Sequence, residues 1–118
     1  MRHQKSKIRL HRPRAASKLL LRNLATSLVI YEKIQTTSSK AKAVQSLMEK
    51  LINAAKNKGE SLAIRMLQEY MDSELGSKKI MEDLIKRYAE RKSGFTRITP
   101  IKFRAGDAAP IVQIQFVE

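Results

Sequence analysis

The chain has 118 residues, no cysteine and a formal net charge of +13. This length suits one domain with an ordinary hydrophobic core, and the lack of cysteine excludes disulfides, thiolate catalysis and cysteine-based zinc or iron–sulfur sites. The longest apolar-rich stretch, residues 19–30, is interrupted by Arg22 and Asn23 and is shorter than the roughly 20 residues of a membrane span. It also lacks a small-residue cleavage site, so we expect a mature cytoplasmic protein with no membrane span.

The excess positive charge is concentrated in two segments. Residues 1–22 contain eight Lys or Arg and no acid, and residues 86–104 contain seven Lys or Arg and one acid. Residues 23–85 are nearly balanced, with nine bases and eight acids. Like charge gathered in this way repels itself unless a polyanion neutralises it, so the pattern favours a nucleic acid as partner.

The chain begins with a segment that lacks the apolar spacing of a helix or strand. Pro13 disfavours a helix before it, and bases recur every two or three residues, so we expect residues 1–17 to form an extended basic arm on phosphates. A solubilising tail is the alternative. The only histidines, His3 and His11, lie in this cationic stretch, so we expect no metal site. Residues 18–118 then form a single globular domain.

The first helix is predicted over residues 18–31. Leucines and an alanine recur on one face of it, and Tyr31 falls on the same arc, so we expect this tyrosine to face the core. Residues 32–37 read as a strand in which Ile34 points to one side and Lys33 to the other.

Three further helices are predicted from apolar residues that recur at helical spacing. The clearest follows Thr37 and carries the stripe Val44, Leu47, Met48, Leu51, Ile52 and Ala55. Gly59 is expected to end it in the left-handed conformation. The next helix is expected to open at Ser61, and Ser77 is expected to cap a last helix that closes before Gly94.

Two strands are predicted at the end of the chain, over residues 95–104 and 111–117, as an antiparallel hairpin around the loop AGDAAP. Pro100 cannot donate a hydrogen bond to a neighbouring strand, so its strand is bulged there or lies at an edge. Alternation puts Lys102 and Arg104 on the side opposite Ile101 and Phe103, and Asp107 is expected to serve the turn. The fold class is therefore α+β, with a small three-stranded mixed or antiparallel sheet packed against about four helices.

The sequence contains no phosphate-binding glycine loop, carboxylate cluster or nucleophile–base pair, so we expect neither an enzyme nor a cofactor or small-molecule substrate. The usual DNA-binding motifs are also missing. Four of the six aromatic residues are assigned to core faces, which argues against single-strand stacking. Folded RNA, bound through its backbone, is the favoured partner. A free-standing RNA- or DNA-binding protein remains the alternative.

The chain resembles the family of bacterial large-subunit ribosomal protein seventeen. The resemblance is carried by MRHQKSKIRLHRP, RNLATSLVIYEKIQTTSSKAKAV, MEKLINAAK and GFTRITPIKFRAGDAAPIVQIQFVE. It implies an α+β domain with an amino-terminal arm on ribosomal RNA, a structural role near the peptide exit tunnel, and neighbouring large-subunit proteins as partners.

The candidate RNA-binding residues come from two arguments. The resemblance implies RNA contact at Arg2, His3, Lys5, Arg22, Lys40, Lys42, Arg97 and Arg104. The charge pattern alone adds Lys7, Arg9, Arg12, Arg14, Lys18 and Lys102.

Overall fold

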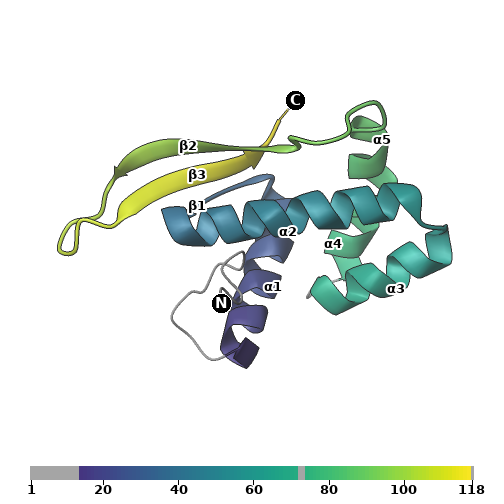
Figure 1. The fold of residues 1–118 in the computed structure, drawn as a ribbon, viewed down its shortest axis with the longest axis horizontal. Coiled ribbons are helices and arrows are strands. Elements are labelled where there is room, and N and C mark those ends of the chain that lie inside the picture. Colours follow the sequence, from purple (N-terminus) through teal and green to yellow (C-terminus); the bar gives the residue numbers. More distant parts are fainter. Residues whose placement is uncertain (1–13, 72–73, 118) are drawn as a thin grey trace, which may run out of the picture.

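The computed structural model describes residues 14–71 and 74–117. Its elements, in chain order, are α1 (Arg14–Tyr31), β1 (Lys33–Thr37), α2 (Ser38–Asn57), α3 (Glu60–Tyr70), α4 (Glu74–Lys79), the π-helical segment η1 (Ile80–Leu84), α5 (Ile85–Arg87), β2 (Thr96–Phe103) and β3 (Pro110–Phe116). Helices and an antiparallel sheet together confirm the α+β class (Figure 1).

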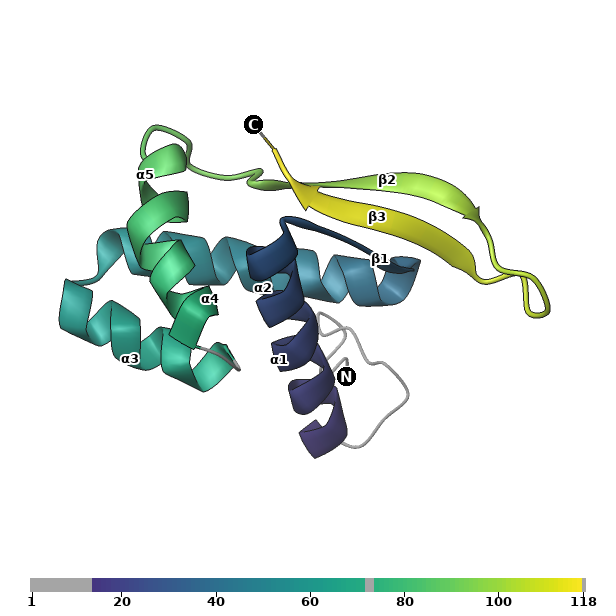
Figure 2. The same cartoon turned by 180° about the vertical axis from the view of Figure 1, so that it is seen from behind.

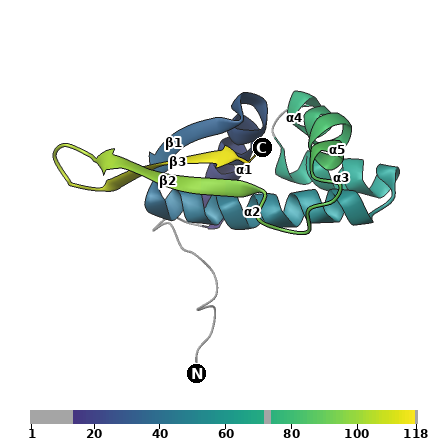
Figure 3. The same cartoon turned by 90° about the horizontal axis from the view of Figure 1, so that it is seen from above.

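Helix α2 is the central element of the fold. It contacts all three strands on one side and α1, α3 and η1 on the others, and it runs along the sheet in both Figure 1 and Figure 3. The predicted stripe is confirmed: Val44, Met48, Leu51 and Ile52 are buried, because their helical spacing puts them on one face.

The three strands are antiparallel in the order β1-β3-β2. Ile114 of β3 stands opposite Ile34 of β1 and Ile98 of β2, and this row lies on the inner face, against α2. The register shifts between Pro100 and Lys102, and β2 is an edge strand, so the prediction of a bulge or an edge position at the proline is confirmed. Beyond it the hairpin projects past the end of α2 (Figure 1).

An aromatic cluster joins the last helix to the sheet. The ring centroid of Tyr88 lies 5.2 Å from that of Phe95 and 6.4 Å from that of Phe116, and its hydroxyl donates to the carbonyl of Val117. Burial raises the pKa of this hydroxyl. The carboxylate of Glu49 on α2 accepts hydrogen bonds from the backbone N–H groups of Gly94 (2.8 Å) and Phe95 (3.1 Å), which fixes the entry to β2.

The boundary between α2 and α3 differs from the prediction. Gly59 has φ −62°, so it is not left-handed, and it forms the amino-terminal cap of α3, which begins at Glu60 rather than at Ser61. The reason is that Lys58 already leaves the helix in extended conformation while its N–H donates to the carbonyl of Ala54 at 2.9 Å. The turn needs no left-handed residue.

The start of the last helical segment was also predicted wrongly. Ser77 does not cap it, because the helix begins at Glu74, whose carboxylate suits the positive end of the helix dipole. Ser77 is therefore buried inside α4. The segment then passes through η1, a wider π turn that the regular apolar spacing does not predict.

The prediction that Tyr31 faces the core is wrong, because this residue is 71% exposed. It is the last residue of α1, and the chain turns directly after it, at Glu32, into β1. Figure 2 shows α1 from the other side, leading into β1 at the edge of the sheet.

Candidate nucleic-acid interface

The sheet has one face turned away from α2, which we call the outer sheet face. Its positions follow from the register, since residues opposite one another share a face: Lys33, Gln35 and Thr37 of β1, Arg97, Thr99 and Lys102 of β2, and Ile111, Gln113 and Gln115 of β3. In these three described strands the outer sheet face carries three bases and no acid. Such a face suits the backbone of a nucleic acid.

Two of the predicted contacts, Arg97 and Lys102, lie exposed on the outer sheet face. Lys33 was not predicted as a contact, but it stands opposite Gln115, which in turn stands opposite Arg97. Alternation within β1 placed Lys33 and Ile34 on different faces of the strand. Only the pairing of β1 with β3 brings it beside Arg97, and sequence reasoning did not predict that pairing.

The hairpin turn holds the predicted contact Arg104. Its guanidinium donates two hydrogen bonds to the carboxylate of Asp107, from Nε to Oδ1 at 3.0 Å and from Nη2 to Oδ2 at 2.6 Å. Oδ1 also accepts from the backbone N–H of Ala109 at 3.2 Å, which confirms the turn role expected for Asp107. Mainly because of Arg104, the pKa of Asp107 falls to about 2.

The predicted contacts on α1 face α3. The guanidinium of Arg22 is partly buried and donates to the carbonyls of Gln68 (3.3 Å) and Met71 (3.2 Å), where α3 ends. Lys18 lies 3.9 Å from the carboxylate of Glu69. Arg22 therefore has a structural role that sequence reasoning missed, and RNA contact by these two residues stays a prediction.

The remaining predicted contacts do not share the outer sheet face. Lys40 is half-buried and Lys42 exposed, and both belong to α2, which packs against the inner face. Arg14 begins α1, but its side chain lies outside the described residues. The arm residues Arg2, His3, Lys5, Lys7, Arg9 and Arg12 also lie outside them.

Beside the outer sheet face, at the junction of α1 and β1, a pocket of about 650 Å³ is lined by Tyr31, Glu32, Lys33, Arg87, Arg91, Arg97, Gln115, Phe116 and Val117. Its single acid, Glu32, accepts hydrogen bonds from Arg87 and Lys79, which lower the pKa of that carboxyl to about 2. The carboxylate is thus ionised and already compensated. The pocket presents positive charge around an exposed aromatic ring.

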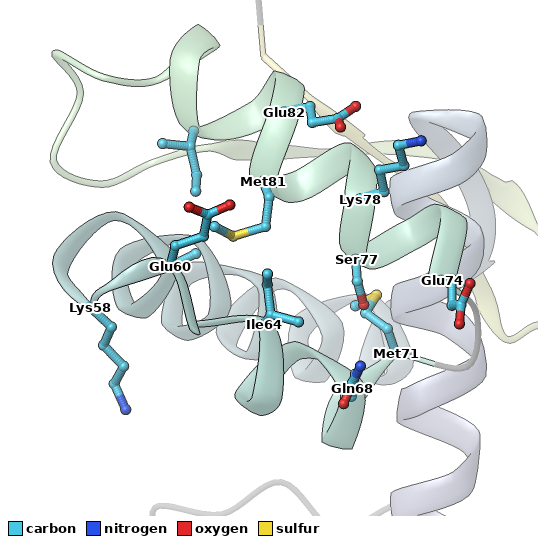
Figure 4. A pocket seen from close by; sticks show the side chains of 12 residues that line it. Lys58, Glu60, Ile64, Gln68, Met71, Glu74, Ser77, Lys78, Met81 and Glu82 are labelled. Atoms are coloured by element: carbon cyan, nitrogen blue, oxygen red, sulfur yellow. The ribbon is translucent and has the colours of Figure 1, made fainter. Parts of the chain in front are cut away.

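A larger groove of about 860 Å³ lies between α3 and the segment from α4 to α5. Ile64 and Met81 point into it (Figure 4), and its lining includes three acids, Glu60, Glu74 and Glu82, against two lysines. This charge is unsuited to phosphate, so the groove is not the nucleic-acid interface.

Residues 14–71 and 74–117 also lack the features of a metal site or a membrane span. In these ranges there is no group of three or more His, Asp or Glu side chains that could hold a metal ion. Nor is any helix there long and apolar enough to cross a membrane.

Comparison with known proteins gives one consistent family. A family model described as ribosomal protein L17 matches residues 20–117. The chain is 43% identical over 98 residues to large ribosomal subunit protein bL17 of Desulforudis audaxviator (strain MP104C), covering 83% of this chain and 87% of that protein. It is 42% identical over 118 residues to the protein of the same name from Orientia tsutsugamushi (strain Ikeda), covering 100% of this chain and 81% of that protein. The match therefore spans the helices and the whole sheet.

Proposed function

Because the chain belongs to the ribosomal protein L17 family, we propose that it stabilises folded large-subunit ribosomal RNA by neutralising phosphates, near the peptide exit tunnel. The family resemblance found in the sequence is confirmed by the matches. The chain is accordingly a structural constituent of the bacterial large ribosomal subunit in the cytoplasm, and not an enzyme.

The observation that carries the RNA-binding proposal is the acid-free outer sheet face. Lys33, Arg97 and Lys102 line this surface, and α2 packs behind the sheet at Lys33 and Arg97, while Lys102 lies on the projecting part of the hairpin. Solubility would be served by bases scattered among acids, as they are on α3 and on the segment from α4 to α5. Three bases on one face of the sheet, in described strands whose outer positions carry no acid, fit a run of phosphates.

The proposal is tested by replacing Lys33, Arg97 and Lys102 together with glutamine. All three side chains are exposed, so the variant should remain folded. Removing one phosphate contact should reduce the slope of log affinity against log salt by about 0.7 to 0.9. We expect the variant to bind large-subunit ribosomal RNA more weakly at low salt, with a slope smaller by about two to three.

The control is a second triple glutamine variant, at Lys50, Lys58 and Arg65. These exposed bases lie on α2, at its end and on α3, so the net charge changes by the same amount away from the sheet. We expect this variant to keep most of the slope. Equal losses in both variants would mean that net charge alone drives binding, and the outer sheet face would then have no special role.

The arm is tested by deleting residues 1–12, which removes the proposed contacts Arg2, His3, Lys5, Lys7, Arg9 and Arg12. Five of these carry a full positive charge. We expect RNA affinity to fall by orders of magnitude while helix content and thermal stability are kept. A truncated protein with an unchanged salt slope would refute the role of the arm.

Assembly is tested by sedimentation of the tagged full-length chain. Co-migration with large subunits, together with neighbouring ribosomal proteins, is expected. A free pool that persists in low salt would instead favour a free-standing nucleic-acid-binding protein.

A further inference from the structure

Tyr31 is widely exposed at the point where α1 joins β1. The residue is 71% exposed and lines the pocket at the junction of α1 and β1. The volume of about 650 Å³ lies within the roughly 300–1,000 Å³ typical of small-ligand sites. An exposed aromatic face beside a cleft of this size can serve as a stacking surface.

The backbone holds the ring outward through Glu32. This residue has φ +66°, a left-handed conformation that costs about 1 kcal/mol or more outside glycine. Its N–H donates to the carbonyl of Leu28 (2.7 Å), and its own carbonyl accepts from the N–H of Phe116 (3.1 Å). The end of α1 is thereby tied to the end of β3, and both views in Figures 1 and 3 show these ends close together.

The charges of the pocket suit an anion. Of its four Lys and Arg residues, Arg87 is paired with Glu32 and Asp83, so the positive charge offered to an anion comes from Lys33, Arg91 and Arg97. Lys33 and Arg97 flank Gln115 on adjacent strands, which puts their Cα atoms about 10 Å apart at the usual strand spacing. Two long side chains at that separation can close on one phosphate from either side.

We propose that this pocket holds one unstacked nucleotide of RNA, with the base on the Tyr31 ring and the phosphate between Lys33 and Arg97. The proposal rests on the proposed RNA-binding function and deepens it. It assigns a bulged or looped-out nucleotide to this end of the outer sheet face. The rest of the face contacts only the RNA backbone.

The test compares three RNA hairpins that differ at one position: a single-adenosine bulge, the same bulge with an abasic nucleotide, and full pairing. We expect the wild-type protein to prefer the adenosine bulge over the abasic one by about tenfold, as stacking of one base allows. Tyr31→Ala should abolish this preference, and Tyr31→Phe should keep it. Phe103→Ala, at another exposed aromatic residue, is the matched control and should also keep it.

Two outcomes would overturn the proposal while leaving RNA binding intact: equal affinity of the wild type for adenosine and abasic bulges, or a preference that survives in Tyr31→Ala. Failure of the proposed function looks different, because no hairpin would then bind in a salt-dependent manner. Tyr31 is exposed, so its variants should fold, which circular dichroism would verify.

A second readout uses the absence of tryptophan from the chain. Tyr31→Trp introduces one indole into the pocket, and its fluorescence should be quenched by the adenosine bulge but not by the abasic bulge. Phe103→Trp should respond equally to both.

Adenosine monophosphate contains the same base and phosphate without the rest of the RNA. Quenching by the mononucleotide at the same concentration as the bulged hairpin would overturn the assignment to RNA.

Discussion

Arg87 and Glu32 are 55 positions apart in the chain and are joined by two hydrogen bonds, from Nη1 to Oε1 at 2.7 Å and from Nη2 to Oε2 at 3.4 Å. Lys79 adds a third, from Nζ to Oε2 at 2.9 Å. These contacts bind the junction of α1 and β1 to the last helical segment. They also hold in place a residue whose backbone conformation is strained.

The ion pairs of Glu32 predict a specific loss of stability in acid. Its pKa is about 2 in the folded protein against 4.5 ordinarily. The folded-state pKa is the lower one, so this stabilisation is complete above about pH 4.5 and disappears as the pH falls to about 2. We expect Glu32→Gln to cost about 1 kcal/mol at pH 7, after allowing for solvent screening of a side chain that is 41% exposed.

The measurement is urea unfolding of both proteins at several pH values. The gap between them should shrink below pH 4.5 and vanish near pH 2. Glu69→Gln is the control, because its carboxylate lies 3.9 Å from Lys18 and is 59% exposed, so little change is expected. A gap that stays constant with pH would contradict the role given to the charge.

Lys56 is predicted to stabilise the fold although it lies at the end of α2. Its Nζ donates to the carbonyls of Tyr88 (2.9 Å) and Arg91 (2.6 Å) and lies 5.6 Å from the centroid of the Phe95 ring. Lys56→Met keeps most of the stem but removes these bonds, so we expect a loss of about 2 kcal/mol in the free energy of unfolding. Lys58→Met should change it by less than about 0.5 kcal/mol, because Lys58 is exposed. Similar losses in the two variants would show that the contacts of Lys56 contribute nothing.

Local patterns predicted the regular parts of the fold. The stripe on α2 and the hairpin followed from spacing, and the missing N–H of Pro100 predicted a bulge or an edge position there. The exposure of Tyr31 could not be predicted from residue spacing, because its position on the apolar arc of the helix is compatible with burial. Whether a residue at a helix end is covered depends on where the next element goes, and here the left-handed turn at Glu32 decides it.

The candidate interface was predicted only in part, because it also depends on where distant segments of the chain meet. The basic face of the late strand identified Arg97 and Lys102, and the family resemblance also implied Arg97. Lys33 joins them only through the pairing of β1 with β3, a contact between segments about eighty residues apart. Arg22 shows the converse, since the family resemblance gave no sign that its guanidinium bonds the end of α3.

Two glycines should respond in opposite directions to the same substitution. Gly94 has φ +70°, which side chains rarely adopt, so Gly94→Ser should destabilise the protein by about 1 kcal/mol. Gly59 caps α3 at φ −62° with open space around it, so Gly59→Ser should stabilise by about 0.5 to 1 kcal/mol. Thermal unfolding of both variants would measure this. A loss at Gly59 as large as that at Gly94 would contradict the cap geometry.

Asp107 is predicted to restrain RNA binding through Arg104. In the free protein the carboxylate engages the guanidinium by two hydrogen bonds, so part of the charge proposed to meet a phosphate is neutralised. Asp107→Asn removes that charge but keeps an amide oxygen that can accept from the N–H of Ala109, so the turn should survive. We expect tighter binding to large-subunit ribosomal RNA and a salt slope steeper by up to about 0.9, measured by titration over a range of salt. Glu90→Gln changes the net charge equally at another exposed acid and should have the smaller effect. If both substitutions strengthen binding alike, Asp107 acts only through net charge, and Arg104 is not a phosphate contact that it restrains.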